Sequence, residues 1–107
     1  MDRLEEAEKV FREHVELKPN PNINILLAQI FAETGRPKEG EALLKQALEL
    51  EPDHGGVMIT YGDLLAKRGQ YREALEWYEK AKRVDPYRAT ATADKRLVEL
   101  RRGASGG

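Results

Sequence analysis

Residues 55–88, GGVMITYGDLLAKRGQYREALEWYEKAKRVDPYR, decide the fold of this chain. Gly69 separates two stretches of good helix formers, 55–67 and 71–84, and Pro86 follows the second stretch. Glycine adopts the left-handed conformation that closes a helix, and proline cannot continue a helix because it lacks the N–H and clashes with the preceding turn. The segment therefore predicts a helix, a tight glycine turn, a second helix and a proline stop.

The same punctuation recurs towards the N-terminus. Gly35 precedes Gly69 by 34 residues, and Pro52 precedes Pro86 by 34 residues. A fixed period of this length is typical of helical repeat proteins, in which one unit cannot bury its apolar face alone and stacks on its neighbours. We expect helices at 2–17, 22–33, 38–50, 55–67, 71–84 and 88–102.

Small side chains recur at equivalent positions of the predicted units. Gly40 aligns with Ala74 in the second helices, and Ala28 aligns with Gly62 in the first helices. A small residue opposite a bulky one lets two helices approach closely, so the pattern predicts tightly packed hairpins. The residues expected to be buried or at close helix contacts are Leu27, Phe31, Leu44, Tyr61, Leu65, Ala74, Trp77, Tyr78 and Ala81.

This pattern resembles the tetratricopeptide repeat family, which has a 34-residue helix–turn–helix unit with recurring aromatic, Leu-Gly, Tyr, Ala, Phe and Pro positions. The matching residues of the unit at 55–88 are Tyr61, Gly62, Leu65, Gly69, Tyr71, Ala74, Tyr78, Ala81 and Pro86. Residues 21–54 match nearly as well, although Gly40 replaces the usual alanine and Pro37 the usual tyrosine. The resemblance implies an all-α fold, an α-α superhelix formed as a short solenoid of antiparallel helical hairpins.

The resemblance also suggests how the chain is divided. The N-terminal residues are similar to the second helix of a unit whose first helix is absent, and the C-terminal helix is similar to the polar helix that closes such arrays. The Gly/Ser-rich end, GASGG, predicts a flexible tail. The expected divisions are a half-repeat at 2–19, repeats at 21–54 and 55–88, a capping helix at 89–102, all within one domain at 2–102, and a tail at 103–107.

The composition excludes several classes of protein. Of the 107 residues, 40% are hydrophobic, which is too many for a disordered chain. No apolar stretch approaches the ~20 residues of a membrane helix, so we expect no membrane insertion. The formal net charge is −1 and no basic stripe follows the first helices, which argues against a nucleic-acid partner. The acidic start, MDRLEE, lacks the features of a signal peptide and favours a cytoplasmic location.

Residue types that carry catalysis or bind metals occur without the spacing that such chemistry needs. The chain has no cysteine, and His14 and His54 belong to no metal-ligand motif. The only serine, Ser105, lies in the predicted tail. The many carboxylates alternate with basic side chains at i,i+4 spacing, which is typical of solvated helix faces. We expect no catalytic residue, no cofactor and no metal, and a protein that is not an enzyme.

A partner surface is implied by the resemblance, because the first helices of tetratricopeptide repeats line a concave groove that binds a peptide or a helix of another protein. Removing the residues expected to pack within each unit leaves one face on each first helix. Ile25 and Ile59 occupy equivalent positions of that face, which favours an apolar binding patch, although simple packing would also account for them. The predicted groove residues are Asn22, Ile25, Gln29, Glu33, Gly56, Ile59, Asp63 and Lys67.

The N-terminal helix has the apolar residues of a second helix, yet no first helix precedes it. Part of its surface is therefore expected to stay open, along an edge formed by Leu4, Ala7, Val10 and Phe11. Either the chain is part of a longer protein, which we favour, or another copy closes the edge and gives a homodimer. Self-association through this edge is the alternative to groove binding.

Overall fold

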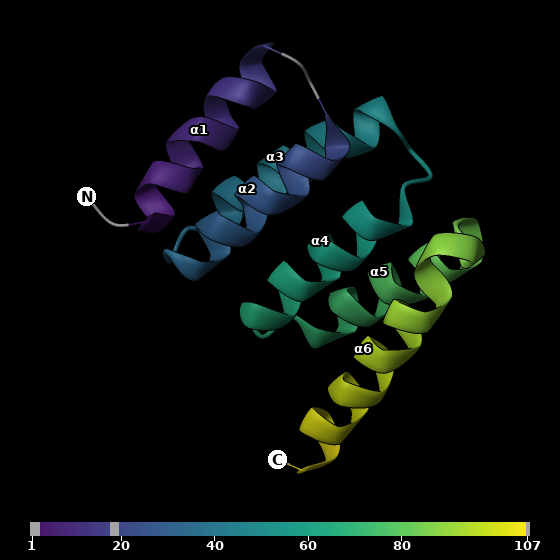
Figure 1. Cartoon of the computed structure of the whole chain (residues 1–107). Coiled ribbons are helices and arrows are strands. Elements are labelled where there is room, and N and C mark those ends of the chain that lie inside the picture. Colours follow the sequence, from purple (N-terminus) through teal and green to yellow (C-terminus); the bar gives the residue numbers. More distant parts are fainter. Residues whose placement is uncertain (1–2, 18–19, 107) are drawn as a thin grey trace. The chain divides into compact units, whose positions relative to one another are not determined.

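Six α-helices form the described part of the chain (Figure 1). The computed structural model describes residues 3–17 and 20–106, with their side chains except those of residues 11, 14–17 and 104–106. No strand occurs within these ranges, which confirms the all-α fold. The first five helices begin and end within one residue of the predicted ranges. The helices are α1 (Arg3–Leu17), α2 (Pro21–Glu33), α3 (Pro37–Leu50), α4 (Gly55–Lys67), α5 (Tyr71–Val84) and α6 (Pro86–Gly106).

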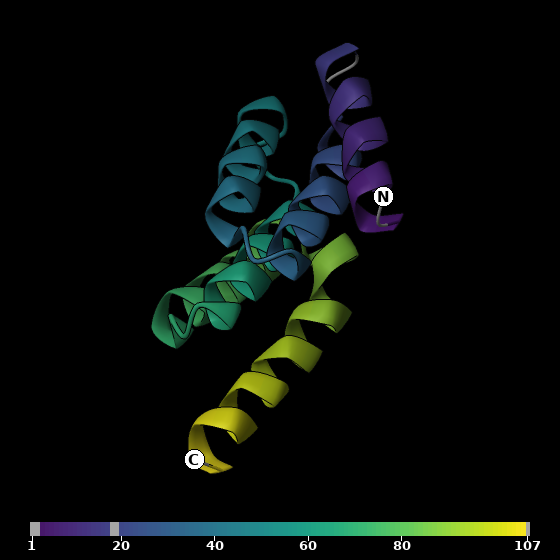
Figure 2. The same ribbon diagram turned by 90° about the vertical axis from the view of Figure 1, so that its left-hand side faces the viewer.

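The helices belong to two compact units. Residues 1–52 contain α1, α2 and α3, and residues 53–107 contain α4, α5 and α6. In the first unit, α2 packs against both α1 and α3. In the second unit, α4 and α5 form a hairpin and α6 packs against both of them. Two views show the last turns of α6 extending beyond the α4–α5 hairpin (Figures 1 and 2).

Both hairpins turn at the predicted glycines. Gly35 has φ +80° and Gly69 has φ +79°, a conformation that side chains with a Cβ rarely adopt. In each hairpin, the N–H after the glycine donates to a carbonyl five residues earlier, at 2.7 Å in the first turn and 2.9 Å in the second. These bonds satisfy carbonyl groups that the helix end would leave unpaired. The glycine turns are therefore confirmed.

The α4–α5 hairpin closes on a glycine that faces an aromatic ring. A Cβ at Gly62 would lie 2.6 Å from Cε1 of Tyr78, so only glycine fits there without a shift of the ring. At the equivalent positions of the α2–α3 hairpin, Ala28 and Leu44 are both 0% exposed. Both hairpins thus bury a smaller residue of the first helix and a larger residue of the second at the positions that the alignment of the units pairs.

The predicted core is confirmed at eight of its nine residues, and Trp77 is the exception. Trp77 is only partly buried. Its ring tilts against that of Tyr61, with the ring centroids 4.7 Å apart. The ammonium group of Lys80 lies 5.1 Å from the Trp77 ring centroid. The buried residues are Leu27, Phe31, Leu44, Tyr61, Leu65, Ala74, Tyr78 and Ala81.

The last helix is longer than the sequence predicts. It begins at Pro86, two residues before the expected start, because proline is well suited to the first turn of a helix even though it cannot continue α5. It continues through Gly106, where a flexible tail from residue 103 was expected. Glycine within a helix costs only ~1 kcal/mol relative to alanine, so one or two glycines do not by themselves stop a helix.

Candidate functional site

One face of α4 lies against α6. Gly55, in the first turn of α4, is so close to α6 that a Cβ there would lie 2.7 Å from the Cβ of Ala89. Two turns later, Nε of Arg96 on α6 donates to Oδ1 of Asp63 on α4 at 2.9 Å. Positions four apart share one face of a helix, so Ile59 belongs to the same face as Gly55 and Asp63. This is the face of α4 that the sequence assigned to a partner groove.

The four predicted groove residues of α4 differ in exposure. Ile59 is 6% exposed, Gly56 and Asp63 are half-buried, and Lys67 is exposed. Ile59 is therefore buried, which agrees with the alternative of simple packing at this position. Gly55 and Asp63, one turn before it and one turn after it on this face, both contact α6. Asp63 and Lys67, further along α4, remain in reach of a partner.

An open cavity of about 430 Å³ is lined by residues of α4, α5 and α6. Ala66 and Leu100 supply apolar surface, and the other lining residues are polar or charged. A cavity with some apolar surface and a few placed polar groups is the usual form of a binding site. The lining residues are Asp63, Ala66, Lys67, Tyr78, Arg96, Glu99 and Leu100.

A polar network holds one side of this cavity. Oδ1 of Asp63 accepts hydrogen bonds from the Tyr78 hydroxyl at 2.5 Å and from Nε of Arg96 at 2.9 Å. Nη1 of Arg96 also lies 3.7 Å from Oε2 of Glu99. Burial, followed by the hydrogen bond to Asp63, raises the pKa of Tyr78 far above its usual value, so the hydroxyl stays protonated and remains a donor. The network links α4, α5 and α6 and fixes the Asp63 carboxylate.

Lys67 differs from the other charged residues of the cavity. It is exposed in the last turn of α4, and no ion pair to it is found among the described side chains. The charges of Asp63 and Arg96, by contrast, are already paired with each other. An unpaired ammonium group beside apolar surface can attract a carboxylate of a partner.

Three lining residues of α6 were not in the predicted groove. They are Arg96, Glu99 and Leu100. The sequence gives only a weak signal for them. The apolar residues of this last helix, Ala93, Leu97 and Leu100, are shifted by one position from the repeat pattern, so the sequence does not determine which side of the helix faces α4. Two other residues of α6, Asp94 and Arg101, face α5 instead. Asp94 pairs with Nζ of Lys82 at 2.6 Å, and Arg101 lies 3.9 Å from Glu79.

The predicted groove residues of α2 lie in the first unit. Asn22, Gln29 and Glu33 are exposed and Ile25 is half-buried, so all four are at the surface. Asn24, between them, is 1% exposed, and its Nδ2 donates to the Leu43 carbonyl at 2.8 Å.

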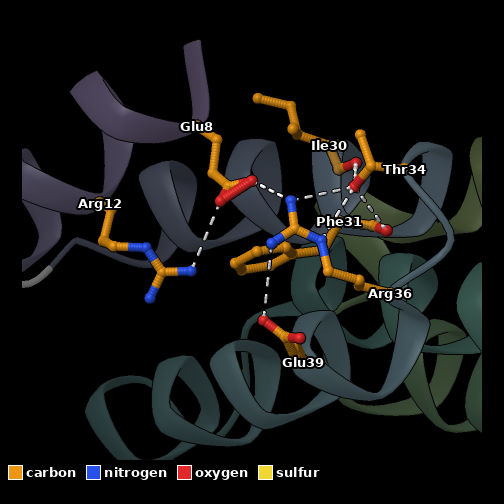
Figure 3. Close-up of polar contacts among 7 residues, drawn as sticks. All are labelled: Glu8, Arg12, Ile30, Phe31, Thr34, Arg36 and Glu39. Carbon is orange, nitrogen blue, oxygen red and sulfur yellow. Dashed lines mark hydrogen bonds and ion pairs between the residues drawn. The ribbon is translucent and has the colours of Figure 1, made fainter. Parts of the chain in front are cut away.

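A charged cluster joins α1 to the α2–α3 turn (Figure 3). Arg36 pairs with Glu8, and Arg12 lies 3.7 Å from the other oxygen of the same carboxylate. The guanidinium groups of Arg12 and Arg36 lie 4.9 Å and 4.7 Å from the centroid of the Phe31 ring. The hydrogen bond to Glu8 raises the pKa of Arg36. The cluster thus covers Phe31, which is 1% exposed, with two cations that share one carboxylate.

The cluster borders a polar cleft of about 610 Å³. Leu4 and Glu33, each of which the sequence placed on a partner surface, are among its lining residues. The other lining residues are Glu5, Glu8, Thr34 and Arg36.

The predicted association edge is open in part. Val10 is 61% exposed, while Leu4 and Ala7 are half-buried. The side chain of Phe11 lies outside the described residues. Val10 is thus open on α1, and association of another chain or helix through this edge stays a prediction.

The part of the chain that the structure describes contains neither a metal site nor a membrane span. Among the described side chains, no group of three or more His, Asp or Glu is arranged to hold a metal ion. No helix in the same ranges is long and apolar enough to cross a membrane.

Comparison with known proteins identifies a family. The sequence profile of the tetratricopeptide repeat family matches residues 31–91, from the end of α2 to the first turns of α6. The chain is 30% identical over 91 residues to Protein O-mannosyl-transferase Tmtc1 of Drosophila melanogaster. This match covers 78% of this chain and 11% of that protein. It is 27% identical over 74 residues to Tetratricopeptide repeat protein 21B of Xenopus laevis, covering 69% of this chain and 6% of that protein. The chain therefore spans only a small part of the length of these curated relatives.

Proposed function

Because the chain belongs to the tetratricopeptide repeat family, we propose that it is a non-enzymatic interaction module that binds a peptide or a helix of a partner protein at the cavity between α4 and α6. Repeats of this family are generally scaffolds that bind proteins or peptides. The observation that carries the proposal is the cavity itself, where apolar surface from Ala66 and Leu100 adjoins the ammonium group of Lys67, for which no ion pair is found among the described side chains.

The charges around the cavity suggest the chemistry of the partner. Asp63 is paired with the Arg96 guanidinium and accepts a hydrogen bond from the Tyr78 hydroxyl, so it has little attraction left for a further cation. Lys67 is the cation without a partner among the described residues. A segment with an apolar side chain beside an aspartate or glutamate fits this arrangement, because the apolar group covers Ala66 and Leu100 while the carboxylate meets Lys67.

The test is selection from a displayed library of random dodecapeptides, followed by fluorescence anisotropy with the selected peptides. We expect selected sequences to combine apolar and acidic residues. Lys67→Glu should weaken their binding at least about tenfold, because the substitution replaces an attraction with a repulsion.

Lys95→Glu is the matched control. It makes the same change of charge on an exposed residue of α6 that does not line the cavity, so the affinity should change less than about twofold. Peptides whose affinity is unchanged by Lys67→Glu, or a library that yields no binder, would contradict the proposal.

Self-association through the α1 edge remains the second candidate, and the exposure of Val10 favours it. If copies associate there, Val10→Glu should shift the chain towards monomer in sedimentation velocity, because a buried carboxylate without a partner is costly. A wild-type chain that stays monomeric up to millimolar concentration would exclude this candidate.

A further inference from the structure

A second open groove, of about 280 Å³, is lined by residues of α5 and α6. Its apolar surface comes from Tyr71 and Leu75 on α5 and from Leu100 on α6. Tyr71 is 54% exposed, and Leu75 and Leu100 are half-buried. Apolar side chains that adjoin one another in a hollow are typical of interaction surfaces, whereas single exposed apolar residues are not.

The two charged residues that complete the lining of this α5–α6 groove are both arginines. Arg72 comes from α5 and Arg101 from α6, so each helix supplies one cation. Arg72 is exposed, and no ion pair to it is found among the described side chains. Arg101 lies 3.9 Å from Glu79, and both side chains are largely exposed, so this pair is weak. The groove therefore keeps most of its positive charge.

The cavity between α4 and α6 has a different balance of charge. Its two cations face two carboxylates, so its formal lining charge is zero; these residues are Lys67, Arg96, Asp63 and Glu99. The α5–α6 groove has two cations, and no carboxylate is among its described lining residues. Leu100 lines both sites, so they are neighbours that differ mainly in charge. An acidic group is attracted more strongly to the α5–α6 groove.

We propose that the α5–α6 groove is a second binding site, for a segment of a partner protein in which large apolar side chains lie between acidic residues. The apolar side chains cover the Tyr71 ring, Leu75 and Leu100. The acidic residues on either side meet Arg72 and Arg101, because a planar guanidinium group donates two parallel hydrogen bonds to one carboxylate. This site does not depend on binding at the cavity between α4 and α6.

The test is an NMR titration of the ¹⁵N-labelled whole chain with a capped hexapeptide that has a central Leu-Phe pair between two glutamates on each side. We expect the shifted amides to lie at 71–75 and 100–101. Glutamine in place of each glutamate should weaken binding at least about tenfold, because the attraction between charges is lost. Two serines in place of Leu-Phe should also weaken it at least about tenfold, because the peptide then buries little apolar surface.

Variants of the chain separate this site from the rest of the surface. Arg72→Glu should weaken binding at least about tenfold, since it replaces an attraction with a repulsion. Arg72 is the second residue of α5, where a glutamate interacts favourably with the helix macrodipole, so the variant should fold. Arg83→Glu is the matched control. It makes the same change on an exposed residue of α5 outside the groove, so the affinity should change less than about twofold.

Lys67→Glu distinguishes this proposal from that for the cavity between α4 and α6, and here it should change the affinity less than about twofold. Shifts at 63–67 that Lys67→Glu abolishes would place the peptide in that cavity and overturn the proposal. A serine peptide that binds as tightly as the Leu-Phe peptide would overturn it too, as would an affinity unchanged by Arg72→Glu or the absence of binding at millimolar peptide. Broadening of the 71–75 amides that needs no peptide and disappears on dilution would assign the groove to a second copy of the chain instead. The peptide comparisons use the wild type alone, so they decide the proposal even if a variant does not fold.

Discussion

The two helical hairpins have the same backbone plan but different central pairs. The α4–α5 hairpin places Gly62 against Tyr78, and the α2–α3 hairpin buries Ala28 and Leu44 at the equivalent positions. A smaller residue on the first helix thus accompanies a larger one on the second. The difference shows that the repeat fixes the combined volume at the contact more strongly than it fixes either residue, as expected for a densely packed interior.

The hairpins also differ at one buried position, which is polar in the first hairpin and apolar in the second. Asn24 is buried in the α2–α3 hairpin, and no hydrogen-bond partner is found for its Oδ1 among the described residues. Met58 holds the equivalent position, 34 residues later, and is 1% exposed. One hairpin therefore has an apolar side chain where the other keeps an amide that is only half satisfied.

The largest expected effect is at Tyr78, which fills the centre of the second hairpin. Tyr78→Ala should lower the free energy of unfolding by about 3–5 kcal/mol, since it leaves a cavity beside Gly62 and removes the donor to Asp63. Trp77→Ala, one residue earlier, should cost only about 1–2 kcal/mol, because that ring is partly exposed. Urea unfolding measures both. A Trp77 variant less stable than the Tyr78 variant would show that Trp77, and not Tyr78, fills the centre of the second hairpin.

The second prediction replaces the central pair of the α4–α5 hairpin with that of the α2–α3 hairpin. Gly62→Ala should cost about 1–3 kcal/mol, because the added methyl group overlaps the Tyr78 ring. Tyr78→Leu in the same chain recreates the pair of the first hairpin and should recover part of this loss. A double-mutant cycle measures the coupling, which we expect to favour the double variant by about 0.5–3 kcal/mol. Additive losses would mean that the volumes at this contact do not compensate each other.

A smaller effect is expected where the hairpins differ in polarity. Asn24→Met places the residue of the second hairpin in the first, and it removes a buried oxygen without a partner. The Leu43 carbonyl loses a donor but lies within α3, so we expect a gain of up to about 1 kcal/mol. Chemical denaturation gives the difference directly. A loss of stability would indicate that the bond from Asn24 to Leu43 outweighs the unsatisfied oxygen.

The hairpins were predictable from the sequence because their signals are local. Gly35 and Gly69 mark the turns, and the apolar spacing between each glycine and the next proline defines the helices. Each of these features acts within a few residues, so the ranges of the first five helices agree with the structure to within one residue.

The candidate site was less predictable, because it depends on how α6 rotates against α4. Asp63 and Lys67 were found from their positions in the repeat, but Arg96 and Leu100 were not. A rotation of one residue about the α6 axis decides which of its side chains reach Asp63, and this rotation is fixed by close contacts such as that of Ala89 with Gly55. Such contacts join residues more than 30 positions apart, and no local pattern encodes them.

The smallest effect concerns the helix starts, where the two hairpins differ in charge. The hydrogen bond from the Gly55 N–H, together with the charge of Arg88, holds the pKa of Asp85 below its usual value. The Asp85 carboxylate therefore contributes its full stabilisation above the pKa of an unfolded aspartate, about 3.9. This contribution is lost as the pH falls through the lower pKa of the folded state. Asn20, at the start of α2, has no such dependence.

Asp85→Asn tests this contribution, because it keeps an acceptor for Gly55 and removes only the charge. It should cost about 0.3–1 kcal/mol at pH 7, the usual value of a carboxylate at a helix N-terminus. The difference between the variant and the wild type should shrink as the pH falls below about 4, where the carboxyl group of the unfolded wild type begins to bind a proton, and should vanish below the lower pKa of the folded state. Asn20→Asp is the converse control: it adds a charge at the start of α2, and so should give that helix a cap that weakens in acid. Urea unfolding at pH 7 and pH 3 compares the three chains. An Asp85→Asn penalty that is equally large at both pH values would show that Asp85 acts through its shape and hydrogen bonds, with no part for its charge.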